Sequence, residues 1–243
     1  KWQAALKAGN VEVLRGLAER FRHRVLSVFP KAQYSGSWAS ANANFAYRLS
    51  ELSEFEHPLE HMTEARSLYG EALPSAAPEW HKSMWASYQH SYAEILLRFA
   101  DVSGNAQPLD QARAICEQVS THHDSERRRA LTTLGAILRR IAERNLAAAT
   151  CKAALDALKR ADIDQDPATG DLSWALQRTT LAAVLLLKHQ VSPGQDDLVT
   201  AHRSVQQALS NYRLNPHQFW IRPSWIEDSV STNAKIEQLI WIE

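Results

Sequence analysis

A pattern of large and small apolar residues occurs three times along this chain of 243 residues. Each copy opens with Trp-Ala, and 23 residues after that alanine come an apolar residue and, three positions later, a second alanine. The opening tryptophans are Trp38, Trp85 and Trp174, and the apolar residues are Met62, Leu109 and Leu198. A divergent fourth copy pairs Arg129-Ala130 with Leu146-x-x-Ala149-x-x-x-Ala153. A repeat of this length predicts stacked units of the same local structure.

The apolar residues inside each copy recur at spacings of three and four, which is the period of an α-helix. Glycine (8) and proline (9) are sparse, and no segment alternates apolar and polar residues as a strand does. We therefore predict an all-α protein, a right-handed α-solenoid of about four antiparallel helical hairpins with terminal capping helices. The expected parts are an N-terminal helical cap or truncated repeat (1–36), four repeats (37–212), and a C-terminal loop with a capping helix (213–243).

Several helix ends carry recognisable signals. Asn10 is placed as the N-cap of an early helix, and Pro58 lies in the first turn of another, where a missing N–H costs nothing. Thr121-x-x-Asp124 predicts a capping box that opens a long helix ending near residue 144. A final helix is expected from Ser224, with an apolar face that covers the end of the stack: Ile226, Val230, Ile236 and Ile240.

Small residues at fixed positions predict close contacts between paired helices. On the first helices of the repeats these are Ala39, Ala86, Ala130 and Ala175, and on the second helices they are Ala65, Ala112, Ala149 and Ala201. We interpret the tryptophans of the repeats as core side chains, because a tryptophan stripe belongs to a core far more often than to a ligand site.

These residues carry a resemblance to the tetratricopeptide-like repeats of bacterial proteins, in the longer-period form whose first helix opens with Trp-Ala. The similar segments are Trp-Ala-Ser-Ala-Asn-Ala-Asn-Phe-Ala from Trp38, Trp-Ala-Ser-Tyr-Gln-His-Ser-Tyr-Ala from Trp85, and Thr133-Leu134-Gly135. The loops are longer than in the standard repeat, and Arg129 replaces a tryptophan. The resemblance implies a scaffold that binds peptides or domains in a groove lined by first helices. It also implies that such repeats in bacteria often accompany a protease or a signalling ATPase.

No motif for catalysis or for a cofactor is present in the sequence. Glu54-x-x-His57 has the spacing of a di-iron helix motif, but it has no second copy and Pro58 follows it, so we interpret His57 as a loop histidine. No H-E-x-x-H, phosphate-binding glycine loop or G-x-S-x-G occurs. Cys116 and Cys151 fall on apolar helix faces, which predicts reduced, buried thiols and a cytoplasmic protein. We expect no enzyme activity, no cofactor and no metal.

Charge is balanced overall (27 basic and 27 acidic residues) but uneven along the chain. The segment 127–160 contains nine Lys or Arg residues and only two acidic residues. The segment from Glu51 to Glu64 contains five glutamates and no Lys or Arg. Two solvated surfaces are the commoner explanation. The functional alternative is a basic ridge for an acidic partner or a nucleic acid, formed by Arg127, Arg128, Arg139, Arg140 and Arg144.

The expected function is non-enzymatic binding of a protein or peptide partner in a repeat groove. Its candidate contacts are polar or aromatic residues on first helices that packing does not need: Asn42, Tyr47, Gln89, His90, Glu94, Arg98 and Arg178. One alternative is a sensor or regulatory segment of a larger bacterial signalling or defence enzyme, since the sequence opens on Lys1 rather than Met. Another is nucleic-acid binding through the basic ridge. We expect no membrane association, because the longest apolar run is far shorter than a membrane span.

Overall fold

The computed structural model describes residues 1–28, 31, 35–75, 82–122, 124–161, 172–194, 196–214 and 222–240. Throughout these residues the protein is helical and contains no strand, which confirms the all-α prediction. Contacts divide the chain into two compact units, unit 1 at Lys1–Glu126 and unit 2 at Arg127–Glu243. Among the described helices, none combines the length and apolar composition that a membrane span requires.

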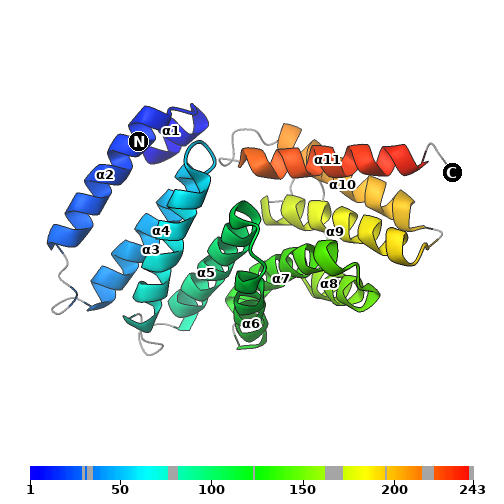
Figure 1. Ribbon diagram of the computed structural model, residues 1–243, viewed down its shortest axis with the longest axis horizontal. Helices are drawn as coiled ribbons and strands as arrows, with labels where there is room; N and C mark the ends of the chain where they lie inside the picture. Colours follow the sequence, from blue (N-terminus) through cyan, green and yellow to red (C-terminus); the bar gives the residue numbers. More distant parts are fainter. Residues whose placement is uncertain are drawn as a thin grey trace. The chain divides into compact units, whose positions relative to one another are not determined.

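Unit 1 consists of helices that pack against their neighbours in the sequence (Figure 1). Helix α1 packs on α2, α3 on both α2 and α4, and α5 on both α4 and α6. A stack of Phe21 on Phe45 joins α2 to α3, and a stack of Tyr69 on Tyr92 joins α4 to α5, each with ring centroids 5.8 Å apart. Their bounds are α1 Trp2–Lys7, α2 Val11–Val28, α3 Ser35–Leu52, α4 Pro58–Ala72, α5 Lys82–Ser103 and α6 Gln107–His122, with a short 3₁₀ turn at Leu73–Ser75.

Unit 2 begins in the first turn of α7. It consists of the pair α7 and α8, the pair α9 and α10, and the last helix, α11. Helix α9 packs on α8 and α10, and α11 lies along α10 and α9 (Figure 1). Gly135 of α7 faces the side chain of Leu158 of α8, so these two helices approach closely at a position without a side chain. The bounds are α7 Asp124–Asn145, α8 Ala148–Arg160, α9 Leu172–Val191, α10 Asp197–Leu214 and α11 Pro223–Ile240.

The repeat pattern marks buried residues in three of its four copies. On the first helices, Ala39, Ala86, Ala130 and Ala175 are all buried, and Trp174 is fully enclosed. On the second helices the buried sets share one spacing of three, four and three residues. They are Met62, Ala65, Tyr69 and Ala72 on α4; Leu109, Ala112, Cys116 and Val119 on α6; and Leu198, Ala201, Val205 and Ala208 on α10.

The predicted register of the fourth copy is wrong. Leu146 is 53% exposed and has a left-handed φ of 47°, and Ala149 and Ala153 are also exposed. Buried residues recur at the same three-four-three spacing five positions later, at Cys151, Ala154 and Leu158 of α8 and at its C-cap Ala161, and Ala157 is buried as well. The helix starts only at Ala148, so the first two residues of Leu-Ala-Ala-Ala, Leu146 and Ala147, belong to the connection before it.

The helix-end predictions have mixed outcomes. Asn10 caps α2 through its Oδ1 atom, which accepts a hydrogen bond from Val13 N at 3.1 Å, and Pro58 occupies the first turn of α4 as expected. The capping box at Thr121 is wrong, because α6 continues to His122 and the Thr121 hydroxyl donates to Glu117 O within that helix. Asp124 itself begins α7.

The predicted apolar face of the last helix is also wrong in register. Of its four residues, Ile236 is completely buried, whereas Ile226, Val230 and Ile240 are 38%, 53% and 38% exposed. The other buried residues of α11 are small and polar, Ser229 and Thr232. Helix α11 therefore packs on the core of α9 and α10 through Ile236 and the partly buried Leu239.

Candidate functional site

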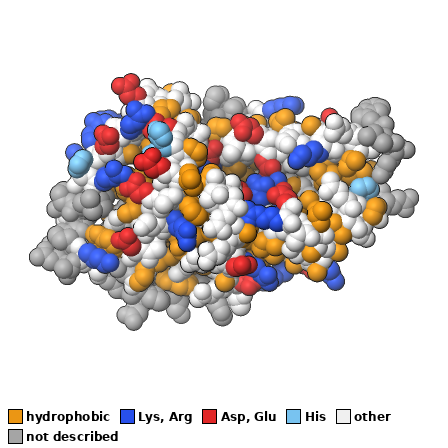
Figure 2. Space-filling view, viewed as in Figure 1, with side chains coloured by type: hydrophobic (Ala, Val, Ile, Leu, Met, Phe, Trp, Pro, Cys, Tyr) orange, Lys and Arg blue, Asp and Glu red, His pale blue; other side chains and the backbone are white. Residues whose placement is uncertain are grey.

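The acidic stretch of unit 1 is neutralised by arginines, three from neighbouring helices and one, Arg48, from α3 itself. Four of its five glutamates have a basic partner: Arg48 binds Glu51, Arg98 binds Glu54, Arg15 binds Glu56, and Arg22 binds Glu64. The hydrogen bond and charge of the Arg15 guanidinium hold the pKa of Glu56 below its ordinary value. Figure 2 shows the result around α1 and α2, where basic and acidic side chains alternate. This stretch ties helices together and offers little net charge to a partner.

The predicted groove residues of α3 and α5 do not form one exposed surface. Asn42 is 2% exposed and donates through Nδ2 to Trp38 O, and His90 is 1% exposed. Arg98 binds the end of α3, with hydrogen bonds to Ser50 O, Ser53 Oγ and Glu54. Arg98 is partly exposed, as are Tyr47, Gln89 and Glu94. Burial removes two of these unit 1 candidates from any contact surface.

The remaining groove candidate, Arg178 of α9, lies in unit 2. Its guanidinium carbon is 5.4 Å from the ring centroid of the buried Trp174, so it stacks on the core residue one turn before it. This cation–π contact gives Arg178 a packing role.

The predicted basic ridge is interrupted at Arg139. Arg127, Arg128 and Arg144 are exposed, but Arg139 is only 7% exposed. Its Nη1 and Nη2 atoms bind the two carboxylate oxygens of Asp228 on α11 at 2.5 Å and 2.7 Å, and its Nε atom binds Glu143 at 2.8 Å. Arg140 also binds Glu143, at 2.9 Å. Two of the five ridge arginines are thus engaged with carboxylates of unit 2 itself.

Burial opposes both charges of the Arg139–Asp228 pair, and their mutual attraction outweighs it. Desolvation alone would lower the pKa of Arg139, but the hydrogen bond and charge of Asp228 raise that pKa above its ordinary value. Desolvation alone would raise the pKa of Asp228, but Arg139 holds it below its ordinary value. Both groups are therefore ionised at neutral pH.

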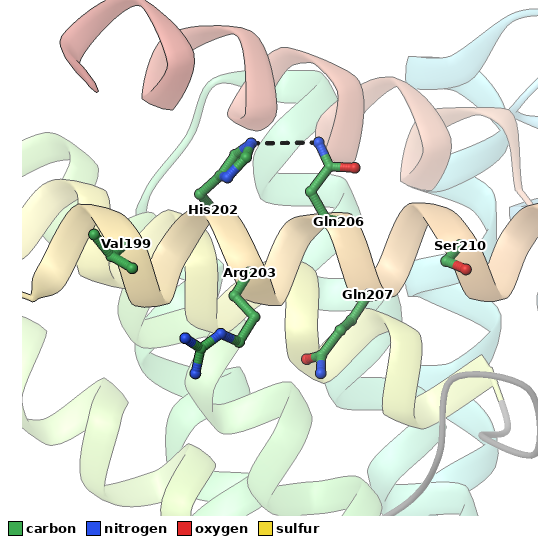
Figure 3. A pocket seen from close by; sticks show the side chains of 6 residues that line it. All are labelled: Val199, His202, Arg203, Gln206, Gln207 and Ser210. Atoms are coloured by element: carbon green, nitrogen blue, oxygen red, sulfur yellow. Dashed lines mark hydrogen bonds between the residues drawn. The ribbon is translucent and has the colours of Figure 1, made fainter. Parts of the chain in front are cut away.

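A depression of about 500 Å³ lies along α10, and five of its six lining residues have polar side chains (Figure 3). The lining residues repeat at spacings of three and one, so they form a stripe on one face of the helix that extends about 17 Å at 1.5 Å per residue. They are Val199, His202, Arg203, Gln206, Gln207 and Ser210. None of these side chains is acidic, which makes the surface electropositive at Arg203.

The side chains of this depression point to two sides of α10. His202 and Gln206 point toward α11 (Figure 3), where Gln206 Nε2 donates to Asn233 Oδ1 at 3.0 Å and His202 Nε2 is 3.6 Å from Glu237 Oε1. Arg203 and Gln207 point to the other side. Within the part of the chain that the structure describes, Arg203 and Gln207 form no hydrogen bond or ion pair. Their donors and acceptors are available to a partner.

The sequence patterns gave no indication of this depression. Helical periodicity predicts which residues of α10 are buried. It does not distinguish among the residues on the exposed face. The one unusual signal is Val199, which is 55% exposed at one end of the polar stripe.

The groups associated with chemistry are buried or scattered. Cys116 and Cys151 are free thiols in the interior, as predicted, and burial raises the pKa of each. His57 lies between α3 and α4 with a left-handed φ of 42°, which confirms that it is a loop residue. In the ranges the structure describes, no three His, Cys, Asp or Glu side chains lie close enough together to hold a metal ion.

Comparisons of this chain with protein-family models, with curated proteins and with solved structures find no match.

Proposed function

We propose that this protein is a non-enzymatic binding module of the tetratricopeptide-like α-solenoid type, and that the depression on α10 binds a carboxylate-bearing peptide segment of a partner protein. The observation that carries this proposal is the polar stripe of α10, in which Arg203 and Gln207 have no partner among the described residues. The buried three-four-three pattern common to α4, α6, α8 and α10 supports the repeat architecture.

The chemistry of the stripe suits a peptide better than a small apolar ligand. Small-molecule pockets are lined mainly by apolar and aromatic side chains, whereas Val199 is the only apolar residue that lines this depression among the described residues. A glutamine side chain carries both a donor and an acceptor, so Gln207 can pair with a peptide N–H or C=O group. A guanidinium binds a carboxylate with two parallel hydrogen bonds, which is the role we assign to Arg203.

Nucleic-acid binding through the basic ridge has less support. Phosphate contacts require exposed cations, and Arg139 is buried against Asp228 while Arg140 is bound to Glu143. Three exposed arginines of the predicted ridge remain, at Arg127, Arg128 and Arg144. Among the described residues, the depression on α10 combines a hollow surface with hydrogen-bonding groups of Arg203 and Gln207 that have no partner there.

The test is a selection of displayed random peptides against the full chain, followed by affinity measurements on three proteins. These are the wild type, Arg203→Glu in the depression, and Arg213→Glu, which changes an exposed arginine of the same helix outside the lining. We expect selected peptides to contain Asp, Glu or a free C-terminus, and to bind Arg203→Glu at least tenfold more weakly than the other two. A selection that yields no peptide, or peptides that bind all three proteins equally, would refute the proposal.

A further inference from the structure

The residues that line the depression on α10 form two rows, and within each row the residues are four positions apart. One row is Val199, Arg203 and Gln207, and the other is His202, Gln206 and Ser210. Side chains four positions apart form a ridge on a helix, and two helices pack when a ridge of one enters the groove between two ridges of the other. The depression therefore has a shape that accepts a ridge of a second helix.

The row nearer to α11 is held in place by that helix (Figure 3). Gln206 Nε2 donates to Asn233 Oδ1 at 3.0 Å and lies 3.4 Å from His202 Nε2. Asn233 Nδ2 donates to Glu237 Oε1 at 2.9 Å, and His202 Nε2 lies 3.6 Å from the same oxygen, so the four side chains form a closed ring. A partner that binds here meets side chains that are already ordered, which lowers the entropic cost of binding.

The side of α11 that borders α10 also carries exposed apolar residues. Ile226, Val230 and Ile240 are exposed. At 100° per residue they fall with Asn233 and Glu237 within about 80° of arc on the helix. Asn233 and Glu237 are the residues of α11 that contact the lining of the depression. The row of α10 that α11 holds in place is therefore bordered by apolar side chains.

We propose that the segment bound in this depression is an amphipathic α-helix of about three turns that lies along α10. The inference rests on the proposed function and adds the conformation and the polarity of the bound segment. One edge of the bound helix carries an acidic residue that pairs with Arg203. The other edge carries apolar residues that cover Ile226 and Val230 of α11. Three turns match the distance of about 17 Å from Val199 to Ser210.

A helix suits this surface better than an extended segment does. An extended peptide gains main-chain hydrogen bonds by adding a strand to the edge of a sheet, and the helices that the structure describes offer no such edge. A bound helix satisfies its own N–H and C=O groups, so only its side chains need partners. Arg203 and Gln207 can provide them, because they form no hydrogen bond or ion pair within the described ranges.

The conformation is tested on the tightest peptide obtained by selection against the full chain. Each residue of this peptide is replaced in turn by proline and, separately, by alanine. Proline inside a helix removes a hydrogen bond and clashes with the preceding turn, whereas the first turn tolerates it. We expect interior prolines to weaken binding at least tenfold, including at positions where alanine has no effect.

The apolar edge is tested on the protein with Val230→Glu. The matched control is Ser231→Glu, which places the same charge at the next position, about 100° further round α11. Both positions are exposed, so neither change disturbs the packing of unit 2. We expect Val230→Glu to bind the peptide at least fivefold more weakly than the wild type does, and Ser231→Glu to bind it equally well.

The outcomes separate this inference from the proposed function. If interior prolines are tolerated while Arg203→Glu still weakens binding, the segment binds in an extended form, and the inference is overturned although the peptide site remains. Equal affinities of Val230→Glu and Ser231→Glu would overturn it as well, because α11 then contributes no apolar contact. If no selected peptide depends on Arg203, the proposed function fails and this inference fails with it.

Discussion

Two glycines that lie inside helices should respond in opposite ways when they are changed to alanine. At Gly16 of α2, no atom lies within 4 Å of the position that an alanine Cβ would occupy. At Gly135 of α7, the added Cβ would lie 2.6 Å from Leu158 Cδ2 and 2.7 Å from Leu158 Cγ. Carbon atoms in contact are normally separated by 3.5–4.0 Å, roughly 1 Å more. Leu158 is 2% exposed and has little room to move.

The magnitudes follow from two opposing effects. Replacing glycine by alanine inside a helix contributes about 0.5–1 kcal/mol, because alanine loses less backbone entropy on folding. Overpacking a core typically costs about 1–3 kcal/mol. Gly16→Ala should therefore raise the free energy of unfolding by about 0.5–1 kcal/mol. Gly135→Ala should lower the free energy of unfolding by about 1 kcal/mol, because the cost of overpacking exceeds the gain from replacing a glycine inside a helix.

The assay is chemical denaturation combined with scanning calorimetry on the two variants, because the two glycines lie in different compact units. A third measurement places Gly135→Ala in a Leu158→Ala background. There the clashing carbons are gone and the new methyl group partly fills the cavity, so the same substitution should become stabilising. If Gly135→Ala stabilises the wild-type chain as much as Gly16→Ala does, the close contact between α7 and α8 does not exist.

The other predictions concern the repeat register and the buried ion pair. Ala112→Trp should lower the melting temperature by several degrees, because Ala112 is completely buried; an unchanged melting curve would contradict the register. The pKa of Asp228 is lowered in the folded protein. Its ion pair with Arg139 therefore stabilises the fold fully at pH values above the unfolded pKa of about 4, and this stabilisation is lost as the pH falls through the folded pKa. Acid titration of unfolding should therefore be less steep in Asp228→Asn, and equal slopes would refute this.

The sequence predicted the helices well wherever one alanine stands out from larger neighbours. Ala65, Ala112 and Ala201 each follow an apolar residue by three positions, and all three are buried. In α8 the prediction failed because small residues occupy most positions from Ala147 to Ala157, so several registers fit the same pattern. The true register depends on which residues meet α7 and α9, and this information is not local.

The candidate site was less predictable for the same reason. Arg139 belongs to a basic stretch in the sequence, but its partner Asp228 lies 89 residues away. Local charge counts reveal neither the ion pair nor the burial that accompanies it. The depression on α10 depends on which polar residues remain without partners after folding, and no periodic pattern marks them. Exposure and pairing are properties of the assembled unit.

The contact of Arg98 with the end of α3 has a consequence for how unit 1 opens. The last carbonyl groups of a helix lack partners within that helix, and Arg98 of α5 donates to one of them, Ser50 O. Fraying of the last turn of α3 therefore requires α5 to release it, so the two hairpins should exchange their amide hydrogens as one cooperative block. Two hairpins joined in this way open together, in a step larger than one hairpin.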